Sequence, residues 1–188
     1  MRMGGESFAE ATMEDLSLHI LDIVENSVAA NADTIEIRIT ENIEKDLLSI
    51  EVIDNGMGMD EETLEKVLDP FYTSKTVRRF GLGIPLLSES AKAANGRLSI
   101  TSKKGEGTKI RADFQHSHID RKPLGDMSQT IITLIMGSPE INLIYVHTKD
   151  SMTYRFDTEK IKALIGDSPI NSLDGIRAIR EELKQIQK

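Results

Sequence analysis

The residues of this chain that could do chemistry gather in four short segments. These are DIVENSVAANADTIEI (Asp22–Ile37), DNGMGM (Asp54–Met59), GLG (Gly81–Gly83) and GEGT (Gly105–Thr108). The first supplies carboxylates and an amide, the second supplies an aspartate with two glycines, and the last two are glycine turns. Carboxylate and amide oxygens accept hydrogen bonds, whereas glycine turns let the backbone approach a ligand closely. In this order, the segments predict a nucleotide pocket made from a helix, a strand end and two glycine turns.

The polar residues at the start of the first segment require a helix to present them on one side. Residues 16–30 repeat apolar side chains at helical spacing, which predicts an amphipathic helix. Its apolar face comprises Leu16, Ile20, Ile23, Val24 and Val28. The opposite face, at i, i+3, i+4 and i+7, comprises Asp22, Glu25, Asn26 and Ala29. One face can therefore pack on a sheet while the other presents three polar groups to a ligand.

Two strands are expected after this helix, and the second ends at an acidic residue. Residues 35–39 alternate isoleucine with polar side chains, which predicts a half-buried strand. Residues 48–52 predict a second strand that places Asp54 at its end. The following Asn55-Gly56 could form a simple hairpin turn. The neighbouring glycine motifs favour a ligand site instead.

Further elements are expected to position the downstream glycines. Asp60 can cap a short helix that ends before Pro70. The GLG segment opens a helix that runs to about residue 94. Pro85 fixes the start of this helix at the GLG segment, because proline is tolerated only in a first turn. Main-chain amides at that helix start would point at phosphate groups. Residues 97–103 and 108–114 predict a hairpin across the GEGT turn.

The ordered segments resemble the GHKL superfamily of ATPases and kinases, named for DNA gyrase B, heat-shock chaperone, histidine kinase and MutL. IVENSVAANADTIEI is similar to MutL-type mismatch-repair ATPases. FYTSK followed by GLGIPLLSESAKAANGRLSITSKKGEGT looks like the catalytic domain of nitrogen-regulation-type histidine kinases. The resemblance covers about Leu16 to Phe114. It implies an α+β Bergerat fold, an α/β sandwich with helices on one face of a mixed β-sheet, and it implies ATP with magnesium.

The resemblance also assigns roles on the first helix. It implies that Asn26 is the magnesium ligand, because an amide oxygen is a hard, neutral donor suited to Mg²⁺. The family's general base lies one turn earlier, where this chain has Asp22. Glu25 is a second candidate that would act through water. The choice between these two catalytic carboxylates stays open.

For the base of the nucleotide, the resemblance implies that Asp54 accepts a hydrogen bond from the adenine amino group. Gly56 and Gly58 would let the backbone approach the base without a Cβ in the way. Thr108 would help to hold the adenine, often through water. These residues complete the base-binding part of the predicted ATP site.

Residues 71–80 are implied to form a lid over the phosphates. Lys75, Arg78 and Arg79 form a basic cluster in an acidic protein, and they could neutralise the triphosphate or the charge of the transition state. The predicted phosphate and lid residues are Thr73, Ser74, Lys75, Arg78, Arg79, Gly81, Leu82 and Gly83.

Composition sets limits on the class of protein. The chain has 188 residues, of which 39% are hydrophobic and 29% charged, so a compact domain with a core is expected. No apolar run reaches the ~20 residues of a membrane helix, and cysteine is absent. The net charge of -8 argues against nonspecific nucleic-acid binding. A cytoplasmic protein without a membrane segment is the expectation.

The composition divides the chain into three parts. We expect a flexible leader at residues 1–14, an ATP-binding domain at 15–117 and a C-terminal α+β extension of unknown role at 118–188. His116 and His118 could form a metal pair, but exposed linker histidines are the favoured interpretation. His19 is expected to be a partly buried helix residue rather than a phosphoacceptor.

Three functions fit these predictions. The favoured one is a stand-alone kinase-like signalling ATPase that acts on or with a separate protein, as anti-sigma-factor-type serine kinases do. The second is an ATP-driven conformational switch of the MutL type, and the third is a nucleotide sensor without chemistry. The first two would make the chain an ATP-dependent protein kinase or an ATP hydrolase. The partner and the oligomeric state are left open.

Overall fold

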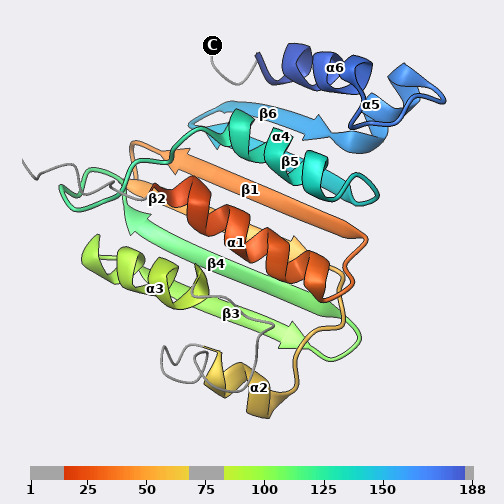
Figure 1. Ribbon diagram of the computed structural model, residues 1–188. Coiled ribbons are helices and arrows are strands. Elements are labelled where there is room, and N and C mark those ends of the chain that lie inside the picture. The colour runs from red at the N-terminus through yellow and green to blue at the C-terminus, as the bar shows by residue number, and fades with distance from the viewer. Residues whose placement is uncertain (1–14, 68–82, 185–188) are drawn as a thin grey trace, which may run out of the picture.

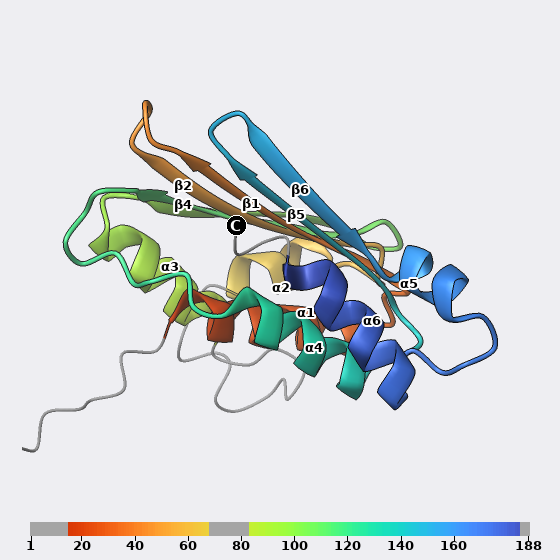
Figure 2. The same ribbon diagram turned by 90° about the horizontal axis from the view of Figure 1, so that it is seen from above.

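The computed structural model describes residues 15–67 and 83–184, which form two layers (Figures 1 and 2). One layer is a six-stranded sheet with the strand order β3-β4-β2-β1-β5-β6. The helices lie on one face of this sheet, as the view in Figure 2 shows. The predicted α+β sandwich with helices on one face of a mixed sheet is confirmed.

Up to residue 115, the elements that the structure describes occur where the residue patterns predict them. The strands are β1 (Thr34–Asn42), β2 (Leu47–Asp54), β3 (Arg97–Lys103), β4 (Gly107–Gln115), β5 (Asn142–Lys149) and β6 (Met152–Asp157). The helices are α1 (Leu16–Ala29), α2 (Glu61–Lys66), α3 (Gly83–Ala93), α4 (Met127–Gly137), α5 (Thr158–Ile165) and α6 (Leu173–Leu183). None of the helices that the structure describes is long and apolar enough to span a lipid bilayer.

Helix α1 forms because its start is capped and one face is apolar. The Asp15 carboxylate accepts hydrogen bonds from Leu18 N at 3.2 Å and from Ser17 Oγ at 2.6 Å, which satisfies donors at the helix start. Ile20 and Ile23 on the apolar face have no exposed surface. The helix therefore lies along the sheet, with Asp22 and Glu25 on its exposed side.

The sheet is mixed because the C-terminal part of the chain joins it. Strand β1 pairs antiparallel with β2 on one side and parallel with β5 on the other. Residues 142–157 thus extend the sheet that residues 34–115 begin, and they do not build a separate sheet. In the register of β1 and β2, Ile35 lies opposite Asp54, which places that carboxylate at the end of the central strands.

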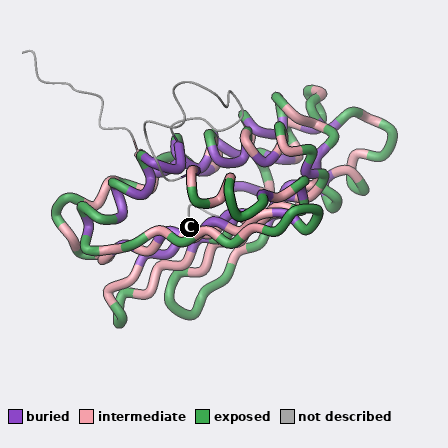
Figure 3. The backbone as a smooth tube through the Cα atoms, turned by 90° about the horizontal axis from the view of Figure 1, so that it is seen from below, coloured by how far each residue is buried: buried purple, intermediate pink, exposed green. Residues whose placement is uncertain are grey.

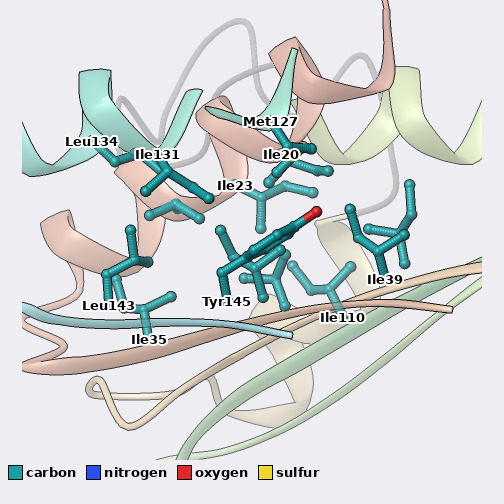
Figure 4. Close-up of a cluster of buried hydrophobic side chains, with 14 of the residues drawn as sticks. Ile20, Ile23, Ile35, Ile39, Ile110, Met127, Ile131, Leu134, Leu143 and Tyr145 are labelled. Carbon is teal, nitrogen blue, oxygen red and sulfur yellow. The ribbon is translucent and has the colours of Figure 1, made fainter. Parts of the chain in front are cut away.

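A single core lies between the helices and the sheet. Figure 3 shows buried residues along both layers, and exposed residues in the loops and at intervals along the helices. In Figure 4, Tyr145 of β5 lies between the helix layer and the sheet. It shares the core with Ile23 of α1, Ile131 of α4 and Ile110 of β4. The C-terminal residues therefore share the core of the N-terminal part of the chain.

The segment between β4 and α4 is tied to both layers. His116 N donates to Asp46 O at 2.9 Å, and Leu16 N donates to Pro123 O at 2.9 Å. His19 is 2% exposed and its Nε2 lies 3.3 Å from the Lys122 Nζ, so its predicted burial on the helix is confirmed.

The expectation of exposed linker histidines is wrong. The side chains of His116 and His118 are only 21% and 20% exposed, because the linker folds back on the sheet. The His116 ring hydrogen-bonds to Glu41 at 3.1 Å. Within residues 15–67 and 83–184, no three histidine or acidic side chains come together in a way that could hold a metal ion.

Candidate nucleotide-binding site

A small pocket forms where α1, the end of β2, the start of α3 and the start of β4 meet. Its lining residues are Ile23, Asn26, Ser27, Ala30, Asp54, Met59, Ile84, Thr108 and Ile110. Three predicted ligand-binding residues, Asn26, Asp54 and Thr108, therefore line one pocket, although they are far apart in the sequence.

Asp54 is held by donors from three segments. Its Oδ2 accepts a hydrogen bond from Ser27 Oγ at 2.7 Å. Its Oδ1 accepts bonds from Gly56 N at 2.9 Å and Thr108 N at 3.2 Å. A carboxylate oxygen has two acceptor positions, so Oδ2 keeps one position beside its bond to Ser27. The pocket thus contains a fixed hydrogen-bond acceptor.

Ser27 is a site residue that the sequence analysis does not identify. It is 4% exposed, and its hydroxyl lies 3.3 Å from Ile23 O as well as 2.7 Å from the Asp54 carboxylate. A buried hydroxyl requires a hydrogen-bond partner. The sequence feature that points to Ser27 is its position next to the apolar face of α1 and directly after Asn26. The sequence does not show its hydrogen-bond partner, because that partner is brought close only by the tertiary fold.

The glycines after Asp54 allow a tight loop between α1 and the β3–β4 turn. Gly58 has a φ of +62°, and a Cβ at this position would lie 2.0 Å from Lys103 O. A Cβ on Gly56 would lie 2.9 Å from Ala30 O. Both positions therefore exclude a side chain because protein backbone approaches them. This reason is different from the predicted approach of the nucleotide base.

Thr108 is joined to the neighbouring edge strand. Its Oγ1 lies 2.8 Å from Ser102 Oγ, and the same Ser102 oxygen accepts a bond from Met59 N at 2.8 Å. Ser102 Oγ also donates to Gly107 O at 3.0 Å. Ser102 does not line the pocket, and the sequence analysis does not identify it.

The predicted catalytic carboxylates lie outside this pocket on the same helix. Asp22 and Glu25 are exposed, whereas Asn26 is partly buried. Gly83 at the start of α3 is buried, and a Cβ there would lie 2.7 Å from Asp22 Cβ. The start of α3 therefore packs directly on the turn of α1 that carries Asp22.

The remaining predicted site residues lie outside the part of the chain that the structure describes. They are Thr73, Ser74, Lys75, Arg78, Arg79, Gly81 and Leu82. The predicted leader at residues 1–14 lies outside it as well.

The lining of the pocket matches the chemistry of an apolar group with a hydrogen-bond donor on one edge. Ile23, Ile84 and Ile110 supply apolar walls, and Asp54 supplies the acceptor. An amino-substituted heteroaromatic ring has these properties. The pocket volume is about 20 Å³, which is room for about one water molecule. A ring can enter only if a wall moves, and Met59 has the unbranched side chain that adapts most readily.

The comparison with protein families identifies the class of this chain. The family described as histidine kinase-, DNA gyrase B- and HSP90-like ATPase matches residues 12–118. The match covers more than half of the chain, so the protein belongs to this family, and the predicted superfamily is confirmed. Membership supports ATP as the ligand.

Curated relatives include signalling proteins. The sensor histidine kinase YxdK of Bacillus subtilis (strain 168) is 33% identical over 106 residues, which cover 53% of this chain and 32% of that protein. The anti-sigma F factor of Clostridium beijerinckii is 30% identical over 102 residues, which cover 52% of this chain and 67% of that protein. The chain thus spans about a third of the sensor kinase.

A solved structure shares the fold over a longer stretch. It is described as the N-terminal domain of a DNA repair protein, and it aligns with a TM-score of 0.54 and 17% identity. The alignment covers 83% of this chain and 58% of the other. The likeness in fold therefore extends beyond the residues of the family match.

Proposed function

We propose that this protein binds Mg-ATP at the Asp54 pocket and works as a stand-alone kinase-like signalling ATPase on a separate protein. The observation that carries the proposal is the Asp54 carboxylate, which donors from α1, the following loop and β4 hold beside Asn26 and Thr108. An acceptor fixed in this way suits the amino group of adenine.

The residues of α1 fit the phosphate end of the same ligand. Asn26 would contribute its amide oxygen to Mg²⁺, which prefers oxygen ligands and keeps several waters when it binds phosphates. Magnesium would supply positive charge at the phosphate oxygens. Asp22 and Glu25 are exposed within one turn of Asn26, where either could accept a proton from an attacking group.

The other predicted phosphate contacts complete this proposal. Gly83 begins an 11-residue helix, and the first amides of such a helix favour negative charge. The basic cluster at Lys75, Arg78 and Arg79 would add cations over the phosphates.

A protein substrate or partner is supported by the relatives. Sensor histidine kinases and an anti-sigma factor match the ATP-binding part of this chain. We infer that the chain acts on a protein supplied in trans, with ATP from the cytoplasm. The net charge of -8 makes nucleic acid an unfavourable partner.

One observation favours an ATP-driven conformational switch as the second candidate. Helix α4 packs on α1, and β5 pairs with β1. A displacement of α1 on nucleotide binding would therefore reach the C-terminal residues directly. In this alternative, the C-terminal surface would gate a partner.

The test uses γ-labelled ATP, Mg²⁺ and the purified chain, with Asp54→Asn as the pocket variant and Asp120→Asn as a matched surface control. Free phosphate that depends on Asp54 would support an ATPase, and Asp22→Ala and Glu25→Ala would then identify the base. Asp54-dependent binding without phosphate release would support a kinase that requires its protein substrate, or a nucleotide sensor without chemistry. Binding that does not depend on Asp54 would overturn the proposed site.

A further inference from the structure

We infer that Ser102 is a positioning residue that sets the base selectivity of the pocket, by fixing the hydroxyl of Thr108 as a hydrogen-bond acceptor. The inference rests on the proposed binding of a nucleotide at Asp54. Ser102 lies on the edge strand β3 opposite Thr108 of β4, and it acts from behind the pocket wall.

Three hydrogen bonds meet at the Ser102 hydroxyl. Met59 N lies 2.8 Å from its oxygen, Gly107 O lies 3.0 Å from it and Thr108 Oγ1 lies 2.8 Å from it. A serine hydroxyl can donate one hydrogen bond and accept two. The three neighbours therefore use its full capacity.

The direction of each bond follows from the chemistry of the partners. The Met59 amide can only donate, and the Gly107 carbonyl can only accept. The single Ser102 proton is thus given to Gly107 O, and one acceptor position is taken by Met59 N–H. The remaining position of Ser102 is an acceptor, so the Thr108 hydroxyl must donate its own proton to it. Thr108 Oγ1 can therefore only accept hydrogen bonds from a group in the pocket, because its proton is already donated to Ser102.

The pocket consequently offers two hydrogen-bond acceptors, one from Asp54 of β2 and one from Thr108 of β4. The remaining position of Asp54 Oδ2 is an acceptor, and the fixed Thr108 hydroxyl is another. Asp54 and Thr108 are paired across β2 and β4, so the two acceptors lie side by side. An amino group satisfies such a pair directly or through one water. A carbonyl oxygen in its place would face lone pairs and lose these bonds.

Ser102 therefore strengthens discrimination between an amino and an oxo group on the purine. Without the Ser102 hydroxyl, the proton of Thr108 is released and its hydroxyl can rotate to donate into the pocket. A 6-oxopurine nucleotide should then bind less poorly. The loss of partners for Met59 N and Gly107 O would weaken both nucleotides alike, so the ratio of affinities isolates the effect.

The experiment measures the dissociation constants of ATP and ITP for the full chain by calorimetry with Mg²⁺. These nucleotides differ at the purine 6-position, amino against oxo. We expect Ser102→Ala to reduce the ATP preference roughly three- to tenfold, the worth of one hydrogen bond. Ser102→Thr keeps a hydroxyl and should restore the preference. Ser99→Ala, an exposed change on the same strand, should leave it unchanged.

Thr108→Val supplies the second line of the test. Valine has no hydroxyl to release, so Ser102→Ala should no longer change the ATP-to-ITP ratio in this background. The inference would be overturned if Ser102→Ala leaves the ATP-to-ITP affinity ratio unchanged. It would also be overturned if Ser102→Ala changes this ratio equally in the unaltered chain and in the Thr108→Val background. If the unaltered chain binds neither nucleotide, the proposed function fails instead, so the two failures are distinguishable.

Discussion

The carboxylate of Asp54 combines a fixed position with an open acceptor, and each property has a separate source. Its position comes from Ser27, Gly56 and Thr108, which donate to it from three segments. Its acceptor character comes from the absence of protons on a carboxylate. A variant that keeps the position and changes the character is therefore the sharpest test of the site.

Asp54→Asn is that variant, and we expect it to abolish adenine-nucleotide binding without unfolding the chain. The amide oxygen can still accept from Gly56 N and Thr108 N. The amide NH₂ would face Ser27, whose hydroxyl can turn to accept and can donate to Ile23 O, which lies 3.3 Å away. The pocket would then present a donor to the adenine amino group. Binding is measured by calorimetry, and folding by thermal unfolding.

The matched control for this change is Asp120→Asn, an exposed aspartate in the linker before α4. It should bind ATP as the unaltered chain does. Unchanged ATP affinity in Asp54→Asn would show that the base binds elsewhere. A loss of the folded state would instead show that Ser27 does not adapt to an amide.

Asn26→Ala is expected to remove the magnesium dependence of ATP binding. The amide oxygen is the proposed ligand on α1, and alanine keeps the helix because its helix propensity is high. ATP affinity is measured with Mg²⁺ and with EDTA in both proteins. Ser128→Ala, on α4 and outside the pocket lining, is the control. A variant that still needs Mg²⁺ for full affinity would place the metal on other residues.

At this scale the sequence predicts the residues that belong to motifs, but not those that support them. Asn26, Asp54 and Thr108 are found because their neighbours form recognisable segments. Ser27 and Ser102 are missed because their roles depend on partners brought close by folding, such as the Asp54 carboxylate for Ser27. That contact requires α1 to cross the end of β2. A residue pattern does not contain such a crossing.

The helices and strands position the site because their backbones pack closely against one another. Gly83 illustrates this, since the first turn of α3 lies against Asp22 of α1. The sequence predicts the start of α3 from the glycines and Pro85, and that start is confirmed. It predicts a phosphate-binding purpose for the glycine but not this helix contact. The glycine is thus required by packing whether or not phosphate binds.

Gly83→Ala should therefore destabilise the chain and weaken ATP binding. A Cβ at this position would lie 2.7 Å from Asp22 Cβ, so α3 must shift away from α1. Such overpacking costs about 1–3 kcal/mol. Gly137→Ala is the control, because a Cβ there meets nothing within 4 Å and alanine favours the helix. Denaturant unfolding gives both stabilities, and equal stabilities would contradict the contact.

Across the residues that the structure describes, two parts of the chain build one sheet. The sequence predicts an α+β extension from residue 118, but local patterns do not specify which strands become neighbours. Parallel pairing of β5 with β1 is set by the shared core around Tyr145 and by the path of the linker. The motifs of the predicted ATP site carry no information on this path, because none of them lies beyond residue 108.

The junction of the two parts carries a hydrogen-bonded cluster of side chains far from the pocket. Glu41 of β1 binds His147 of β5 through Oε1 at 2.8 Å and His116 of the linker through Oε2 at 3.1 Å. His147 Nδ1 is joined in turn to the hydroxyl of Tyr145 at 3.1 Å. Burial raises the pKa of Tyr145 far above its ordinary value, so this hydroxyl stays neutral and able to donate.

The pKa of Glu41 shows how this cluster should respond to pH. Burial alone would raise the pKa, but hydrogen bonds from His116 and His147, helped by the charges of His147 and Lys149, lower it below the ordinary 4.5. A carboxyl group whose pKa is lower in the folded state stabilises the fold above the pKa of the unfolded state. This contribution is present above about pH 4.5 and is lost as the pH falls through the lower folded value.

Glu41→Gln tests the junction because it removes the titrating group and keeps the shape. We expect a loss of about 1 kcal/mol at pH 7, since glutamine replaces one of the two acceptor oxygens, each of which contacts a different histidine, by an NH₂ donor. The difference from the unaltered chain should shrink as the pH falls below 4.5, where the carboxylate itself becomes protonated. Denaturant unfolding at pH 7 and below pH 4 measures both, with Glu44→Gln in the exposed hairpin as control. A difference that stays the same at both pH values would mean that the carboxylate of Glu41 does not hold the C-terminal strands to the sheet.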